Sequence, residues 1–160
     1  MKVFWALSLL AGASLAAVNP QLKQVNSVYI LGMTGGMDQF LANQFTTMSV
    51  FQVVTDPEKA DAIVTDRLGE PFESKLKALY PGDSPGTKKA NDGDISGAAR
   101  VSSLGRGRGT FFIVDRKSHT VLWSTYQEPK DATPEELTKI AKKVVHHLKD
   151  DLTEKKQKSE

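Results

Sequence analysis

Short apolar runs and amphipathic stretches alternate along the first half of this chain. The runs at 28–33, 50–55 and 62–67 are rich in β-branched and aromatic residues, which predicts three β-strands. Between the first two runs, apolar residues recur at helical spacing from Met37 to Met48, which predicts an amphipathic helix. A strand, a helix and a strand in this order form a βαβ unit, so we expect parallel strands joined by a right-handed crossover.

The second half predicts a short helix and a hairpin. The short helix begins near Pro71 and ends at the break formed by Pro81. The runs at 110–115 and 120–127 are separated by a short polar turn, so they should pair as antiparallel strands. Strict alternation within the last run predicts that neighbours such as Leu122 and Trp123 lie on opposite faces of the sheet.

A capping box marks the start of the last helix. Thr133 is a good N-cap, Pro134 suits the first helical position, and Glu136 stands three residues after the cap. Apolar residues then recur at helical spacing as far as Leu152. We therefore expect a long helix that buries one face.

These elements predict one domain of the α/β (α+β) class. Their order is β-α-β-β-(short α)-loop-β-β-α, and two main amphipathic helices on a mixed five-stranded sheet make a two-layer sandwich. The domain should span 27–152, between a linker at 17–26 and a polar tail at 153–160. Residues 82–109 hold seven glycines and few large apolar side chains, so we predict a mobile loop there.

Residues 1–16 have the pattern of a signal peptide. Lys2 supplies a positive charge, residues 3–10 are mostly apolar, and Ser14 and Ala16 have the spacing that signal peptidase reads. We expect cleavage after Ala16 and an exported protein, periplasmic or secreted. The alternative is an uncleaved anchor, but the apolar stretch is shorter than the roughly 20 residues that span a bilayer. No transmembrane segment is expected after cleavage.

Composition excludes several classes of site and partner. The chain has no cysteine, which excludes disulfides, thiolate metal sites and a lipid anchor on cysteine. Lys and Arg total 21 against 19 for Asp and Glu, and loss of Lys2 with the leader would leave 20 against 19. Because this balance is nearly neutral, we expect no nucleic-acid partner.

A glycine-rich turn follows the first predicted strand. It contains Gly32, Gly35 and Gly36 and precedes a predicted helix, as a phosphate-binding loop would. The spacing matches neither the dinucleotide fingerprint nor the P-loop pattern. A tight turn with positive φ accounts for these glycines, and we predict no cofactor.

The residue types that carry catalysis are present but scattered. The histidines are His119, His146 and His147, and the paired acids are Asp56/Glu58, Asp61/Asp66 and Asp92/Asp94. Adjacent residues on a helix diverge by about 100°, so two neighbouring histidines cannot chelate one ion together without a third ligand from elsewhere. The pattern predicts surface histidines, turn-forming acids, and no catalytic or metal site.

Three arginines near the end of the predicted loop are the one candidate for anion binding. They are Arg100, Arg106 and Arg108. Guanidinium groups bind phosphate or carboxylate in a bidentate manner, and outside the cytoplasm such groups belong to phospholipids, lipopolysaccharide or wall polymers. The alternative is a solvated loop without a ligand.

Several stretches together resemble small bacterial envelope proteins. VVTDP at 53–57 is followed by ADAIV at 60–64, and FFIVD at 111–115 leads through VLWS at 121–124 to the capped helix. The chain thus resembles the TolB N-terminal domain and the curli-secretion and penicillin-binding-protein-activator lipoproteins. The resemblance implies binding to proteins or envelope components, although this chain lacks the lipidated cysteine that many of those proteins carry.

The sequence therefore favours a non-enzymatic, exported accessory protein of the envelope or periplasm. Its partner would be an envelope protein or a wall or lipid component, bound through the sheet edge or the loop. Two alternatives stay open: a binder of anionic lipid or polymer through the arginine-rich loop, and an exported hydrolase built on the acids and histidines.

Overall fold

The structure is a computed structural model that describes residues 19–81 and 109–154. Its helices are α1 (Met37–Met48), α2 (Glu70–Leu79) and α4 (Pro134–Glu154), and its strands are β1 (Ser27–Ile30), β2 (Gln52–Val53), β3 (Ala62–Thr65), β4 (Thr110–Asp115) and β5 (Val121–Tyr126). Short 3₁₀ helices are η1 (Pro20–Gln24), η2 (Thr34–Gly36) and η3 (Pro57–Lys59). The predicted leader and the predicted loop, except Gly109, lie outside the described residues.

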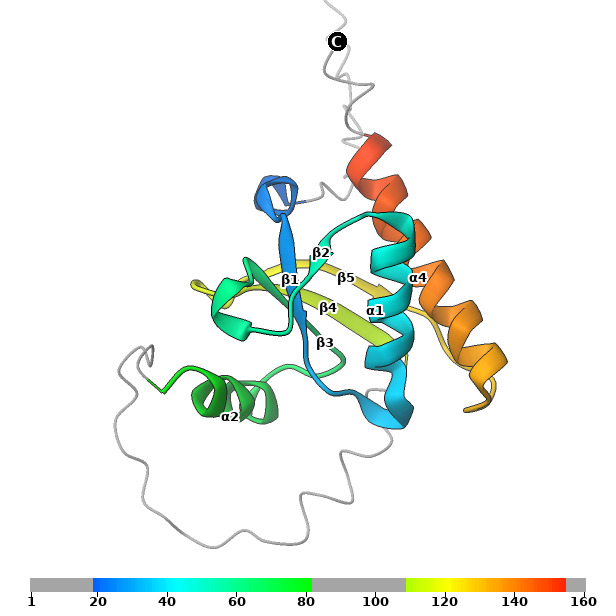
Figure 1. The fold of residues 1–160 in the computed structure, drawn as a ribbon, viewed down its shortest axis with the longest axis horizontal. Coiled ribbons are helices and arrows are strands. Elements are labelled where there is room, and N and C mark those ends of the chain that lie inside the picture. Colours follow the sequence, from blue (N-terminus) through cyan, green and yellow to red (C-terminus); the bar gives the residue numbers. More distant parts are fainter. Residues whose placement is uncertain (1–18, 82–108, 155–160) are drawn as a thin grey trace, which may run out of the picture.

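The strands of the described residues form one mixed sheet in the order β2-β1-β3-β4-β5 (Figure 1). β1 is parallel to both β2 and β3, whereas β4 is antiparallel to β3 and to β5. The βαβ unit and the hairpin are both present. This five-stranded mixed sheet with its amphipathic helices confirms the predicted α+β sandwich class.

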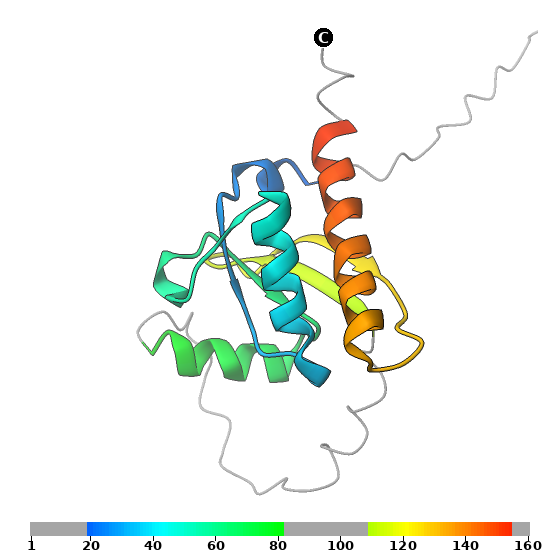
Figure 2. The same cartoon turned by 45° about the vertical axis from the view of Figure 1, so that its right-hand side comes forward.

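Helices α1 and α4 lie side by side on one face of the sheet (Figures 1 and 2). Their apolar stripes place Phe45 of α1 and Val144 and Leu148 of α4 in the same cluster as Val28 and Ile113 of the sheet. Each of these five side chains is at most 2% exposed. Burying one such side chain stabilises the fold by about 1.5–3 kcal/mol, so this layer is the main core.

Helix α2 covers part of the opposite face. Phe72 and Leu76 pack with Ile63 of β3 and Val114 of β4 in a second, smaller cluster. The sequence pattern predicted a short helix here but did not indicate its face. The neighbouring parallel strands β1 and β3 therefore send the chain to opposite faces of the sheet, β1 into α1 and β3 into α2.

Two details of the strands differ from the prediction. β2 is much shorter than the apolar run at 50–55, because only two of its residues pair with β1. The β4–β5 pairing shifts register between Ile113 and Val114, so Leu122 and Trp123 are both buried in the main core. The predicted alternation was wrong at this step because such a bulge puts successive residues on the same side.

Candidate functional site

The carboxyl ends of β1 and β3 open onto a cavity of about 150 Å³. In open sheets, ligands bind outside the carboxyl ends of parallel strands, at the point where the following helices go to opposite faces. β1 and β3 form such a point here. The floor of the cavity is apolar and includes Met33, Met37, Phe111 and Leu137, each at most 9% exposed. We call this space the crevice cavity.

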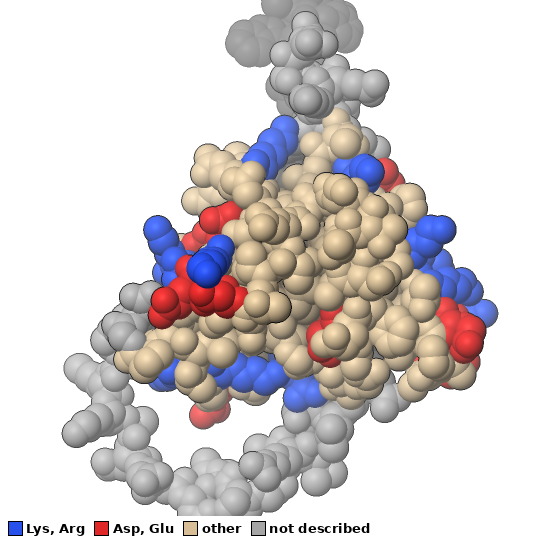
Figure 3. Space-filling view, in the orientation of Figure 1, with Lys and Arg blue, Asp and Glu red and all other residues tan. Residues whose placement is uncertain are grey.

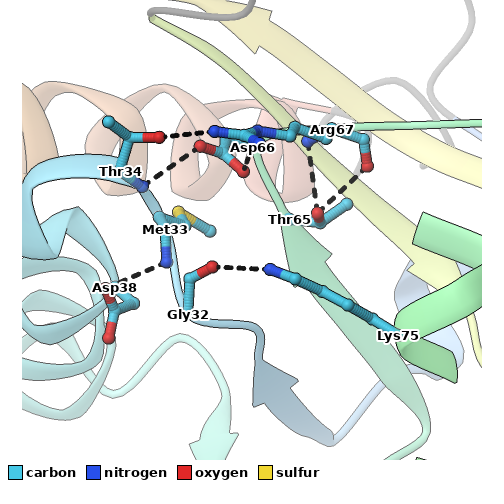
Figure 4. A network of polar contacts seen from close by, with 8 residues as sticks. All are labelled: Gly32, Met33, Thr34, Asp38, Thr65, Asp66, Arg67 and Lys75. Atoms are coloured by element: carbon cyan, nitrogen blue, oxygen red, sulfur yellow. Dashed lines mark hydrogen bonds and ion pairs between the residues drawn. The ribbon is translucent and has the colours of Figure 1, made fainter. Parts of the chain in front are cut away.

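A polar network holds one side of its mouth (Figure 4). The Nη2 of Arg67 donates to the Thr34 hydroxyl at 2.7 Å, and the N–H of Thr34 donates to Asp66 Oδ2 at 3.4 Å. Asp66 and Arg67 also form an ion pair at 3.8 Å. Thr65 accepts the backbone N–H of Arg67 and donates its hydroxyl to the Arg67 carbonyl, at 3.2 and 3.0 Å. The turns after β1 and β3 are thereby fixed to each other.

The turn after β1 is also tied to both helices that flank it (Figure 4). The N–H of Met33 donates to Asp38 of α1 at 3.1 Å. The ammonium of Lys75 on α2 donates to the carbonyl of Gly32 at 2.9 Å. Gly35 and Gly36 have φ angles of +71° and +75°, so the predicted tight turn with positive φ is confirmed at these two positions.

The opposite side of the mouth comes from the loop before α4, where Lys130 and Asp131 line the cavity. Asp131 accepts the N–H of Thr133 at 2.9 Å as well as its hydroxyl, and these bonds lower the pKa of the Asp131 carboxyl. The Thr133 hydroxyl accepts the N–H of Glu136 at 3.4 Å, whereas Glu136 accepts the N–H of Lys130 at 3.5 Å. Only half of the predicted capping box therefore forms.

A second polar cluster joins β5 to α4. The Thr125 hydroxyl contacts His147 Nδ1 at 3.0 Å, and His147 Nε2 lies 3.7 Å from Asp151 Oδ2. The same Asp151 oxygen accepts the indole N–H of Trp123 at 2.7 Å. Although hydroxyl, imidazole and carboxylate follow one another as in a nucleophilic triad, Thr125 is only 9% exposed. The cluster therefore fixes α4 on the sheet and does not present a nucleophile.

A basic groove lies beside this cluster, where β5 ends. Its lining consists of Gln127, Lys139, Lys142, Lys143, His146, His147 and Asp150, and its volume is about 500 Å³. Figure 3 shows blue side chains over the middle of α4, on the right-hand flank of the molecule. Three lysines against one aspartate give this groove a positive character. We call it the lysine groove.

The other predicted polar residues have structural partners or lie elsewhere. His119 contacts Glu73 at 3.1 Å and the ring edge of Phe72, while His146 lies in the lysine groove. Asp56 caps η3 by accepting the N–H of Glu58 at 3.0 Å. Asp92 and Asp94, and the candidate anion-binding residues Arg100, Arg106 and Arg108, lie outside the described residues.

Asp61 stands at the start of β3, and Asp66 follows its end, so this predicted pair does not share a site. The Oδ2 of Asp61 accepts the backbone N–H groups of Asn26 and Ser27, each at 2.9 Å, and the Ser27 hydroxyl at 3.0 Å. Burial acts to raise the pKa of Asp61, but these hydrogen bonds and the charge of Arg116 together lower it. Asp61 therefore fixes the start of β1 to β3.

Among residues 19–81 and 109–154, no group of three or more histidines and acids is arranged to hold a metal ion. None of the helices in these ranges is both long enough and apolar enough to span a membrane. Comparison with models of protein families, with curated proteins and with solved structures found no match to this chain. The resemblance to envelope lipoproteins therefore stays a prediction.

Proposed function

We propose that this chain is an exported accessory protein of the periplasm or envelope that acts by binding a partner protein. The partner adds an extended segment of alternating acidic and apolar residues to the second half of β5. The observation that carries this proposal is an unpaired strand edge beside the lysine groove.

The backbone of β5 supports strand addition. Gln127 donates its N–H to the Gly109 carbonyl at 2.6 Å, and Thr125 stands opposite Phe111 in the same register. Because bonded and non-bonded pairs alternate along an antiparallel ladder, Thr125 directs its backbone groups toward β4. Ser124 and Tyr126 direct theirs away from β4, and no strand of the described residues lies beyond them. Such an edge is a template for another strand.

The two faces beside this edge differ in chemistry. On one face lies the lysine groove of α4, and on the other lies Tyr126, a residue that is 58% exposed. Side chains of an added strand point alternately to the two faces. Acidic side chains would meet the lysines, and apolar side chains would lie on Tyr126. The proposed location in the periplasm or envelope has separate support from the signal-peptide pattern of residues 1–16.

The test uses synthetic peptides of about eight residues, close to the length of an ordinary strand, with alternating glutamate and valine. A matched peptide has lysine in place of glutamate. We expect the acidic peptide to bind, with weaker binding as salt is raised, and the basic peptide not to bind. Amide hydrogen exchange should slow at Ser124 and Tyr126, while the Thr125 amide, already bonded to β4, changes little.

Charge reversal provides the matched variants. The double variant Lys142→Glu with Lys143→Glu should weaken binding of the acidic peptide at least about tenfold, because two attractive charges become repulsive. Lys77→Glu with Lys117→Glu makes the same change of net charge at exposed positions away from the groove and should change affinity less than about twofold. Equal binding of both peptides, or binding that leaves the Ser124 and Tyr126 amides unprotected, would overturn the proposal.

A further inference from the structure

The crevice cavity has the size and lining of a site for one small apolar group. Its floor of methionine, leucine and phenylalanine side chains offers no charge to a ligand. A dry apolar cavity of about 150 Å³ is large enough for a benzene ring. The space therefore fits a ring or a branched alkyl group of about six carbon atoms, and it is too small for a nucleotide or a sugar chain.

Four charged residues line the mouth, and they are not equally available to a ligand: Asp66, Arg67, Lys130 and Asp131. Asp66 already receives the Thr34 N–H and the Arg67 guanidinium, and Asp131 receives two groups of Thr133. Arg67 has five N–H donors: one donates to the Thr34 hydroxyl, and the Nε lies 3.8 Å from Asp66, which leaves donors on the terminal nitrogens for a ligand. The positive charge of Lys130 acts on the neighbouring Asp131, but no hydrogen bond or close ion pair holds its ammonium within the described ranges. Among these four charged residues, the two that can still donate to a ligand are therefore the cationic ones, Arg67 and Lys130.

We propose that the crevice cavity binds a carboxylate carried by an apolar group of about six carbon atoms. The apolar group fills the floor, and the carboxylate meets Arg67 and Lys130 at the mouth. Two sources share this chemistry: a free aryl or branched alkyl acid, and the last residue of a peptide that ends in an apolar side chain. The site is independent of the β5 edge, which lies outside its lining.

The test titrates the purified chain with phenylacetate and follows the methionine methyl signals by NMR. Met33 and Met37 line the cavity, whereas Met48 at the far end of α1 serves as an internal control. We expect Met33 and Met37 to shift and Met48 not to shift, with a Kd of about 1 mM for a ligand of roughly ten heavy atoms. Phenylacetamide, the neutral analogue, should bind about fivefold to tenfold more weakly.

Peptide mimics separate the two sources. N-acetylphenylalanine carries the carboxylate of a peptide terminus, and its amide is the neutral control. If N-acetylphenylalanine binds better than phenylacetate, the ligand is a peptide end; if only phenylacetate binds, the ligand is a free acid. Both outcomes support the proposal. Failure of both carboxylates to shift Met33 and Met37 would overturn it.

Two variants place the ligand. Lys130→Gln should weaken the binding of phenylacetate about threefold to tenfold. The control Lys117→Gln, on the β4–β5 turn, should change the affinity for phenylacetate by less than about twofold. Ala132→Leu adds three carbon atoms to the lining at an exposed position and should abolish binding while the chain stays folded. Binding of phenylacetamide as tight as that of phenylacetate, or unchanged binding in both Lys130→Gln and Ala132→Leu, would contradict the assignment.

Discussion

Gly109 enters β4 with a φ of +90°, and a Cβ added there would lie 2.5 Å from the Gln127 carbonyl oxygen and 2.9 Å from its carbon. Both atoms belong to the backbone of the residue that follows β5, so they cannot move away by a side-chain rotation. Substitution by alanine therefore combines two costs. A side chain in the left-handed region costs about 1–2 kcal/mol, and forcing extra volume into a packed site costs about 1–3 kcal/mol. We expect Gly109→Ala to lower the free energy of unfolding by about 2–5 kcal/mol.

Two other glycines separate these costs. Gly35 has a φ of +71° but open space around its Cβ position, so Gly35→Ala should lose only about 1–2 kcal/mol. Gly32 has open space and no positive φ, so Gly32→Ala should change stability by no more than about 1 kcal/mol and can raise it. The three variants make the same chemical change and differ only in strain and contact.

Urea unfolding followed by far-ultraviolet circular dichroism measures the series. If the reasoning holds, the unfolding midpoints fall in the order Gly32→Ala, Gly35→Ala, Gly109→Ala, with similar m values, because the denatured states are alike. A Gly109→Ala protein as stable as Gly35→Ala would show that the Gln127 backbone does not contact a side chain at this position. Three equal midpoints would refute both the strain and the contact.

Two further predictions concern the core and the acid range. Phe45 is 1% exposed, so Phe45→Ala should lower the free energy of unfolding by about 3–5 kcal/mol, measured by urea unfolding. The control is Asn43→Ala at an exposed position of the same helix, which should change this free energy by no more than about 0.5 kcal/mol. Equal losses in the two variants would refute the assigned core. The folded state lowers the pKa of Asp61, so its charge stabilises the fold above the ordinary pKa, and this stability is lost as pH falls through the lower, folded value. Asp61→Asn should therefore be less stable than wild type at pH 7, by no more than about 1 kcal/mol because solvent screens this exposed charge. The difference should shrink as pH falls below the ordinary pKa of aspartate, as thermal melts at several pH values will show.

Periodicity predicted the elements because their burial is one-sided. The stripe from Met37 to Met48 and the stripe after Pro134 both face the sheet, so helical spacing was a sufficient signal. The bulge at Leu122 was not predictable from alternation, because it depends on the register with β4. The short length of β2 was also not predictable, because pairing with β1, and not local sequence, decides where this strand ends.

Binding through a sheet edge was predicted, but neither the particular edge nor the crevice cavity could be located from local sequence. The crevice cavity brings together the turn after β1, the turn after β3 and the loop before α4, and their meeting depends on the strand order. The contact of Thr125 with His147 joins residues 22 positions apart. The only available signal was Thr34 to Gly36, which stands between a strand and a helix, where open sheets bind ligands.

The two margins of the sheet are unequal in length. On one side β2 is only two residues long, too short a template for a stable additional strand, whereas β5 on the other side is six residues long. Among the described residues, the strand addition proposed above can therefore start only at β5. If the proposed strand addition occurs there, each domain has a valency of one toward extended segments, and it would end an assembly of paired strands instead of extending it into a fibre.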